Sequence, residues 1–474
     1  MTVTSGWQNW TLLGACLLLT ACATPMRSYD NELKKTVNQV ATGRIDQAVK
    51  ELEQQNVLNK DFLYYLEKGE LLRLQGDYRQ SLAQWREADD TVKQWEQEAR
   101  LNPAKLLGDI GSVIINDKVR RYDGQDYEKV MLSTRLALGH LALNDWDSAR
   151  IEIKKMHERE AIIAELRAKA VEKVEEEAKT RHVETKIKDL KGYPVETLDD
   201  PAVVALKNSY QSAFSHYLAG FVYESLGEKS LAAPGYRKAI ELRPQQKILE
   251  EGLRGLDGRM SNRRKANETD VLLVVETGVV PAKSSVTILL PLRLEGKWVA
   301  TPLSFPMIKK TDKTALPSLS VDQTPLALAS VTSTDAMARR ALRDDMPGII
   351  LRTAVRAVLK TAAQKVANDK MGPFGGLLVG VAAVASEGAD ERVWRLLPEQ
   401  FSLVRLRLAK GKHTLLVKTA HGDKRFNFEA KGAAMVLPLR VLGQEVYLMT
   451  PGQAPEKTPE PKPIDQKTST QAAT

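Results

Sequence analysis

The 474-residue sequence is poor in cysteine and in aromatic residues, and it holds no apolar run as long as a membrane-spanning helix needs. Its two cysteines, Cys16 and Cys22, both lie close to the N-terminus. The rest of the chain therefore has neither a disulfide framework nor a zinc site built from cysteines. With 43% apolar residues and a mean hydropathy of −0.31, the chain is too polar for a multispanning membrane protein and long enough for two or three domains.

The charge shows no strong excess of one sign either. Lys and Arg number 69 against 60 Asp and Glu, which leaves a net charge of +9. A surplus spread so thinly suits an anionic neighbourhood, and no dense basic run with interleaved aromatic residues occurs. Nucleic acid is therefore not an expected partner.

An uncharged apolar run, TLLGACLLLTA, occupies residues 11 to 21. It is too short to span a membrane and typical of the central region of a signal peptide. It leads into Leu19-Thr20-Ala21-Cys22, which resembles the lipobox of bacterial lipoproteins, where the cysteine thiol takes a diacylglycerol. We expect a signal peptide over 1–21 and a lipidated Cys22, followed by an anchor linker over 22–29.

Two alternatives to this anchor are an ordinary signal peptide with a coincidental cysteine and an uncleaved anchor. Residues 1 to 10 contain no Lys or Arg, which departs from the usual pattern and leaves open whether Met1 is the true start. Several acyl chains would make the anchoring effectively permanent. By resemblance to enteric lipoproteins, Ala23 after the cysteine implies the outer membrane, with the protein facing the periplasm.

Small and aromatic residues recur with a constant spacing between about residues 30 and 250. Two units share seven offsets, namely Tyr65, Gly69, Leu72, Gly76, Ser81, Trp85 and Ala88, and His216, Gly220, Tyr223, Gly227, Ala232, Tyr236 and Ala239. Weaker units centre on Gly43-Ala48-Leu52 and on Ala137-Asn144-Trp146-Ala149-Ile153. The pattern resembles the tetratricopeptide repeat (TPR), with a period of about 34 residues.

The small residues have a packing reason. Two helices can cross closely where Gly69 or Gly220 meets the second helix, and a left-handed glycine at Gly76 or Gly227 ends the first helix. We therefore predict a TPR-like helical repeat domain over 30–251, with a generic helical bundle as the alternative.

Two interruptions break the array. Residues 107 to 131 predict a structured loop, and its candidate partner-binding residues are Arg120, Arg121, Tyr122, Asp126 and Tyr127. Tyr65 and Tyr223 are predicted to belong to the same surface, although both could instead be core residues inside the repeats. For the five loop residues, the alternative is that the loop only caps its neighbouring helices. The second interruption, about 148–190, lacks Pro and Gly and predicts one long helix, either solvated or in a coiled-coil contact.

After a predicted linker over 252–270, strand patterns replace the helical ones. They begin at Val271, Ser285, Thr324, Phe401, Thr414, Arg425, Ala433 and Glu445. Apolar and polar residues alternate in FSLVRLRL and RFNFEA, which indicates half-buried antiparallel strands. We predict a mostly antiparallel, β-sandwich-like domain over 271–450 and a disordered Pro-rich tail over 451–474, so that the fold class is α+β multidomain.

A helical insertion at about 335–387 interrupts this second domain. Its first part is basic, and its second part, GPFGGLLVGVAAVAS, carries glycines four residues apart. Four-residue glycine spacing lets helices touch, so a hairpin over 349–386 either packs as a buried helix or touches membrane. The hairpin residues named for a membrane or partner contact are Arg352, Arg356, Lys360, Gly372, Gly376 and Gly380.

No HExxH, Walker loop, GxSxG or dinucleotide fingerprint occurs in the sequence. His413 and His421 share one predicted hairpin, and we interpret them as surface residues. Asp390-Glu391 fits loop charges better than an acid/base couple, because neighbours in sequence rarely face one substrate. We therefore expect no enzymatic activity, no cofactor and no metal.

Four blocks resemble a family of bacterial TPR-containing lipoproteins, namely YLEKGELLRLQGDY from Tyr65, INDKVRRYDGQDYEKVM from Ile115, YLAGFVYESLGE from Tyr217 and ADERVWRLLP from Ala389. The resemblance implies the architecture and no reaction. It also hints at cell-wall assembly, since members of this family are often encoded near lipoproteins that resemble activators of penicillin-binding proteins. The expected function is a non-enzymatic scaffold for a cell-envelope complex, specifically peptidoglycan synthesis. The alternative is an accessory part of an export complex, and neither the partner nor the oligomeric state follows from the sequence.

Overall fold

A computed structural model describes most of the chain. The described residues are 29–56, 60–102, 121–183, 185–261, 267–294, 297–310, 312, 314–385 and 388–451. The predicted signal peptide, Cys22, Arg120 and the tail from residue 452 lie outside them. Side chains are described for fewer residues, and those of 290–300 and 360–385 are not.

The N-terminal half consists of paired helices. Among the described residues the hairpins are α2–α3 (Tyr29–Ala41, Ile45–Gln55), α4–α5 (Phe62–Gln75, Tyr78–Leu101), α7–α8 (Asp126–Ala142, Trp146–Arg181) and α10–α11 (Ala213–Ser225, Lys229–Leu242). These are the four units predicted from the small-residue spacing. The fold is therefore TPR-like in this half, as predicted.

The turns inside these hairpins use left-handed residues. Gly43, Gly76, Asn144 and Gly227 have φ values of 77°, 83°, 60° and 85°. Glycine adopts this conformation without a steric cost, and asparagine is among the residues that tolerate it best. The roles predicted for Gly76 and Gly227 are thus confirmed.

The helices of the two best hairpins approach closely, as predicted. In α4–α5, the Ser81 hydroxyl donates to the Gly69 carbonyl oxygen at 2.7 Å, and a Cβ on Gly69 would collide with the indole of Trp85. In α10–α11, a Cβ on Gly235 would lie 2.8 Å from the Gly220 backbone nitrogen. Gly235 therefore marks the backbone-to-backbone contact, which the repeat alignment did not single out.

The long helix α8 ends at Arg181, nine residues before the predicted end. His182 takes a left-handed conformation with φ 54°, and the chain then turns so that Val183 packs beside Ala178. The apolar stripe at the end of α8 meets Leu351 and Val355 of α14 (Thr334–Ala385). The stripe therefore finds its packing partner within this chain.

Short helical elements follow α8. They are η4 (Ile187–Asp189), η5 (Val195–Thr197), α9 (Pro201–Val204), α12 (Lys247–Arg254) and α13 (Leu256–Ser261). The end of α12 and all of α13 occupy residues that the sequence assigned to a linker over 252–270. They are helical because Leu249 and Leu256 are buried, and Gly252 lies against the rings of Tyr217 and Tyr236.

The C-terminal half contains three sheets among the described residues, in the strand orders β11-β10-β1-β7-β6, β2-β3 and β5-β4-β8-β9. The strands are β1 (Glu268–Thr277), β2 (Lys283–Leu294), β3 (Lys297–Ile308), β4 (Ser318–Val321), β5 (Thr324–Leu326), β6 (Ala329–Ser333), β7 (Gln400–Ala409), β8 (Gly411–Thr419), β9 (Gly422–Ala430), β10 (Ala434–Leu442) and β11 (Glu445–Leu448). All strand pairs are antiparallel except β1 with β10. The predicted α+β class is confirmed.

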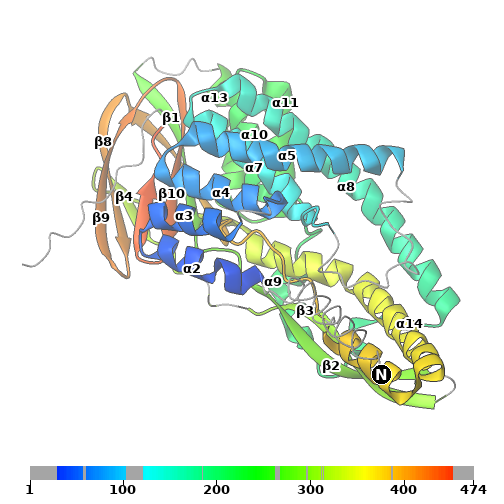
Figure 1. Cartoon of the computed structure of the whole chain (residues 1–474). Helices are drawn as coiled ribbons and strands as arrows, with labels where there is room; N and C mark the ends of the chain where they lie inside the picture. Colours follow the sequence, from blue (N-terminus) through cyan, green and yellow to red (C-terminus); the bar gives the residue numbers. More distant parts are fainter. Residues whose placement is uncertain are drawn as a thin grey trace, which may run out of the picture.

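The five-stranded and four-stranded sheets form the sandwich. Val271, Leu273 and Val275 on one face of β1 share a core with β8 and β9. Leu272 and Val274, on the opposite face, share a core with the helices. Because alternate residues of a strand point to opposite faces, β1 is buried on both sides, and helices cover the face away from the sandwich (Figure 1).

The strands β3 and β4 were missed by the sequence analysis. β3 contains Pro302 and Pro306, which usually argue against a strand, yet it pairs only with β2 in a two-stranded ribbon. Each strand of such a ribbon is an edge, where a missing backbone N–H is tolerated. The ribbon lies beside α14, away from the sandwich (Figure 1).

The predicted helical insertion is present as α14, which interrupts the strand order between β6 and β7. Its residues are assigned to one helical element, Thr334–Ala385, and the hairpin suggested over 349–386 stays a prediction. Within the described residues, no helix combines the length and the apolar character needed to cross a bilayer. Lys360, Gly372, Gly376 and Gly380 belong to α14, but their side chains lie outside the described set.

The largest hydrophobic core joins the two halves of the chain. It contains Trp85 and Tyr217 from the helices together with Leu272, Trp394 and Phe401 from the sheet half. The rings of Phe214 and Phe401 stack with centroids 4.5 Å apart. The helical repeats therefore share a core with the face of the five-stranded sheet that points away from the sandwich interior.

Candidate functional site

The first helices of the repeats, which line the partner groove in TPR arrays, are covered here by the same chain. Helix α4 contacts the segment 389–399, and α10 contacts β6 through a hydrogen bond from the Phe214 backbone N–H to the Thr332 hydroxyl, 3.0 Å long. Nearly every residue of α7 and α10 is buried. A partner bound in the inner groove would have to displace the C-terminal half.

A buried charge network holds the C-terminal half against the first helices of the repeats. Glu276 of β1 is fully buried and accepts hydrogen bonds from Arg73 of α4 and Arg135 of α7, with nitrogen-to-oxygen distances of 2.9 and 2.6 Å. Arg135 also donates to Glu70 at 2.6 Å. Burial would raise the pKa of Glu276, but the charges of Arg135 and Arg73 outweigh it and lower the pKa to about 2. Glu276 is therefore ionised in the folded protein.

A second network ties α10 to β7. The guanidinium of Arg405 on β7 donates to Glu224 of α10 at 2.8 Å and pairs with Asp270 of β1. Arg259 of α13 donates to the same Glu224 at 2.6 Å, and Tyr236 donates its hydroxyl proton there as well. Burial opposes ionisation of Glu224, yet the two arginines lower its pKa to about 2.

The segment 389–399 crosses α4 and α7 through backbone hydrogen bonds. Glu67 of α4 accepts from the backbone N–H groups of Arg395 and Leu396, at 2.6 and 2.9 Å. Glu128 of α7 accepts from the Trp394 backbone N–H at 2.7 Å. The oxygens of these two carboxyl groups satisfy donors that would otherwise be buried without partners.

Glu67 makes stability depend on pH. Burial raises its pKa to about 8, against the pull of the Leu396 and Arg395 N–H groups. Folding therefore takes up a proton between pH 4.5, the ordinary value, and about 8. The stabilisation is complete below pH 4.5 and is lost as the pH rises through 8, at up to about 1.4 kcal/mol per pH unit.

The Glu67→Gln variant, which cannot titrate, should show a flatter dependence of unfolding free energy on pH between about pH 5 and pH 8 in denaturant titrations. Glu224→Gln is the matched control, because the pKa of Glu224 lies far below this range. Equal pH slopes for the wild type and Glu67→Gln would contradict the raised pKa.

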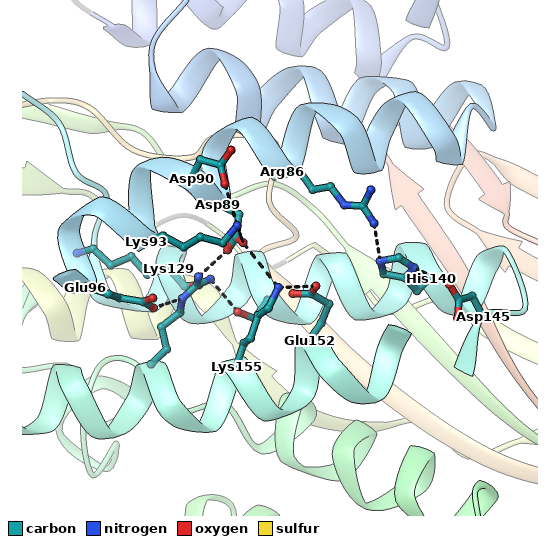
Figure 2. A network of polar contacts seen from close by, with 12 residues as sticks. Arg86, Asp89, Asp90, Lys93, Glu96, Lys129, His140, Asp145, Glu152 and Lys155 are labelled. Atoms are coloured by element: carbon teal, nitrogen blue, oxygen red, sulfur yellow. Dashed lines mark hydrogen bonds and ion pairs between the residues drawn. The ribbon is translucent and has the colours of Figure 1, made fainter. Parts of the chain in front are cut away.

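A third network holds the long helix α8 in place (Figure 2). The buried guanidinium of Arg159 on α8 donates to Asp89 and Glu96 of α5 and to the Ser133 hydroxyl of α7. The ammonium of Lys129 lies 4.1 Å from the centroid of the Trp95 ring. That second contact joins α7 to α5, while the bonds of Arg159 hold α8 against both helices, and the second half of α8 projects beyond the repeats (Figure 1).

The tyrosines predicted to bind a partner are not surface anchors. Tyr122 and Tyr127 are buried, and the Tyr122 hydroxyl donates to Glu128 at 2.6 Å. Tyr223 is buried and Tyr65 is half-buried against the core, which matches the alternative of core positions. Because Tyr122 and Tyr127 are buried at the start of α7, the described part of the predicted loop fits the alternative in which it caps its neighbouring helices. These four residues therefore do not form an exposed binding surface.

An open cleft lies between α8 and α14, with a volume of about 830 Å³. Its α8 wall includes Ile163, Leu166 and Val171, and charged residues of both signs line the rest. Arg167 crosses it, pairing with Asp126 at the start of α7 and with Asp345 of α14. A cleft with an apolar wall and paired charges at its rim has the character of a protein-binding surface.

Two predicted clusters come together beside this cleft. Arg121 and Tyr127, from the predicted loop, line a smaller pocket with Arg352 and Arg356 of α14. Arg121 is half-exposed and pairs with Asp123 at 2.9 Å. The sequence named both clusters but placed them in unrelated roles.

The sequence analysis did not place the other charged residues of the smaller pocket in a site. Lys283 begins β2, and Asp390 and Arg392 belong to the ADERVWRLLP block. Asp390 accepts from Arg392 Nε at 2.9 Å, which agrees with its interpretation as a loop charge. No local pattern marks Lys283, since a lysine at the start of a strand is ordinary; the ADERVWRLLP block was the available signal for the other two.

Groups of three or more His, Cys, Asp or Glu side chains placed to hold a metal ion do not occur among the residues whose positions are described. His413, which the sequence analysis interpreted as a surface residue, bonds through its ring nitrogens to Asp322 and to the Ala409 carbonyl oxygen.

Comparisons with known proteins add little to this geometry. No protein-family model matches the sequence, and no curated protein matches it. A tetratricopeptide repeat protein from Parabacteroides merdae is 14% identical, with 48% of this chain and 98% of that chain covered and a TM-score of 0.14. The C-terminal part of a TPR repeat-containing protein from Cytophaga hutchinsonii is 14% identical over 52% of this chain and 96% of its own, also with a TM-score of 0.14. At these scores neither likeness carries an argument, and the TPR-like description stands on the helical hairpins themselves.

Proposed function

We propose that the protein is a non-enzymatic scaffold of the cell envelope, anchored by lipid on Cys22 to the outer membrane and facing the periplasm. Its partner belongs to an envelope complex, specifically the machinery of peptidoglycan synthesis. The lipobox-like sequence supports the anchor, and the TPR-like hairpins support a role in protein interaction.

The observation that carries the proposal is the cleft between α8 and α14. The inner groove of the repeats is filled by the chain's own C-terminal half, so a partner needs another surface. The cleft offers an apolar side chain to solvent, since Val171 is 54% exposed at its wall. We therefore assign the partner to this cleft rather than to the inner groove.

A photo-crosslinking residue at position 171 should form an adduct with the partner in intact cells. Ile151 is the matched control site, because it lies on the same helix, is 52% exposed and does not line the cleft. Adducts should form at 171 and not at 151. Equal yields at both sites, or none at 171, would contradict the assignment.

Val171→Arg, combined with a crosslinking residue elsewhere on the cleft wall, should lower the adduct yield by about tenfold or more, since a charge on the apolar wall costs binding energy. Ile151→Arg should leave the yield unchanged. Both exposed substitutions should change the unfolding free energy by no more than about 0.5 kcal/mol, so misfolding is not expected to explain a loss.

The anchor is tested by Cys22→Ser, which removes the only thiol that can accept diacylglycerol in this motif. The variant should carry no palmitate label and should leave the outer-membrane fraction. A variant that stays labelled, or that is processed and still fractionates with the outer membrane, would refute the anchor. If the adducts at position 171 contain a component of an export apparatus, the protein would be assigned to an export complex and not to peptidoglycan synthesis.

A further inference from the structure

Strand β7 has an open edge beyond the end of β6. On one side, β7 pairs with β1 along its whole length, from Gln400 to Ala409. On the other side, β6 pairs with β7 only from Gln400 to Leu403, because the chain before Ala329 leaves β7 and comes from β5 in the other sheet. Residues 404–409 therefore have no neighbouring strand on that side among the residues that the structure describes.

The backbone groups of alternate β7 residues point toward this open edge. The Asp270 N–H of β1 donates to the Ala433 carbonyl oxygen at 3.1 Å, on the side away from β7. Asp270 stands opposite Arg407, and two opposite residues of an antiparallel pair either bond to each other or both face away. The N–H and C=O groups of Arg407, and of Arg405 two residues before it, therefore face the open edge. Within the described part of the chain they form no backbone hydrogen bond there.

A groove with a volume of about 630 Å³ lies along this edge. Residues 404–407 of β7 form one wall, and the segment 325–329 and helix α12 form the others. On the sandwich side, Leu326, Leu328 and Leu406 line the groove and are only partly buried against the core that β1 shares with β8 and β9. The groove therefore offers apolar side chains next to backbone groups that can extend the sheet.

The helix side of the groove carries positive charge. Arg407 is exposed there, and its guanidinium forms no ion pair with the residues that the structure describes. Lys247 of α12 has an ammonium 3.6 Å from Glu251, a pair that is open to solvent and therefore weak. The remaining arginines of the lining, and Asp270, belong to the network around Glu224 described above. An acidic group in the groove would thus find cations at its rim.

An extended chain that adds to a sheet edge turns alternate side chains to opposite faces of the sheet. Beside β7, one set would meet the partly buried leucines, and the other set would meet Arg407 and Lys247. We propose that β7 takes up, as an added strand, an extended segment of a partner protein in which apolar and acidic residues alternate.

This groove is separate from the cleft assigned to the envelope partner. Among the described residues, the groove and the cleft between α8 and α14 have no lining residue in common. The strand-addition proposal therefore stands even if the scaffold function fails. If both hold, the protein can hold two partners at once.

The test uses a fluorescent peptide of about seven alternating valine and glutamate residues, roughly the length of the open edge. Its anisotropy is followed as the full-length mature protein is added. The peptide should bind at low salt with a Kd of about 1 mM or tighter, and a peptide with lysine in place of glutamate should bind at least about tenfold more weakly. If the glutamate peptide does not bind, or binds no better than the lysine peptide, the proposal is wrong.

Hydrogen exchange distinguishes strand addition from a simple charge contact. The backbone amides of Arg405 and Arg407 should exchange more slowly when the peptide is bound, because they face the open edge. The amides of Val404 and Leu406 face β1 and should change little. Unchanged exchange at Arg405 and Arg407 in the presence of saturating peptide would overturn the proposal.

Arg407→Glu reverses the charge at the groove and should weaken binding of the glutamate peptide by about tenfold or more. Arg425→Glu is the control, because Arg425 is an exposed arginine on β9 in the other sheet. Both exposed substitutions should leave the melting temperature close to that of the wild type. Equal affinities of the two variants would contradict the assignment of the acidic residues. A wild-type dimer that the peptide dissociates would show that a second copy of the chain occupies the edge, and it would overturn the choice of a partner protein.

Discussion

Glu276→Gln is expected to lower the free energy of unfolding by about 3–5 kcal/mol, because it leaves two buried arginines without their shared counter-charge. Arg73 and Arg135 both donate to this carboxylate, and both are fully buried. The amide of glutamine keeps the size of the side chain but offers one acceptor oxygen and no charge. Packing therefore changes little, and the effect reports the ion pairs.

Denaturant titration of the wild type and the variant at pH 7 measures this difference. Glu241→Gln is the control, since Glu241 pairs with Lys207 and Lys238 at the surface and should contribute no more than about 1 kcal/mol. A loss for Glu276→Gln no larger than that of the control would contradict the network's role. Because the pKa of Glu276 is about 2, its stabilisation is present above pH 4.5 and lost only as the pH falls through 2.

Gly235→Ala is expected to destabilise the protein by about 1–3 kcal/mol or more, although alanine favours a helix over glycine. The added Cβ would lie 2.8 Å from the Gly220 nitrogen and 2.9 Å from the His216 carbonyl oxygen. Both are backbone atoms of α10, so the contact can be relieved only by moving one helix against the other.

Gly258→Ala in α13 is the matched control. A Cβ there meets nothing within 4 Å, so the helix preference of alanine should act alone and leave stability unchanged or raise it by up to about 1 kcal/mol. Thermal melts of the two full-length variants give the comparison. Equal melting temperatures would argue against the close helix crossing in α10–α11.

The helical hairpins could be predicted from the sequence because their signals are local. Gly69 and Ser81 are twelve residues apart, and Gly76 sits at the turn between their helices. Most strands were predicted for the same reason, since the alternation in β7 and β9 is visible within one segment. β3 was missed because its prolines argue against a strand unless its edge position is known.

The site could not be predicted in the same way. The contact between Arg135 and Glu276 spans 141 residues, and that between Glu67 and the Leu396 N–H spans 329. The Tyr122 hydroxyl meets Glu128 only six residues away, but that glutamate also binds the Trp394 N–H of a segment 266 residues away. The local sequence does not show that distant segment, so a tyrosine beside arginines indicated an exposed interface. Such pairings depend on how the halves pack, and they decide which surfaces remain open.

The central claim is that the C-terminal half fills the inner face of the repeats as part of one folding unit. Hydrogen exchange of the wild type and Glu276→Gln, followed amide by amide, tests it most directly. The substitution is on β1, yet amides of α4 and α7 should lose protection together with those of β1 and β7, and by the same free energy. A loss confined to the strands, with α4 and α7 protected as in the wild type, would contradict the claim.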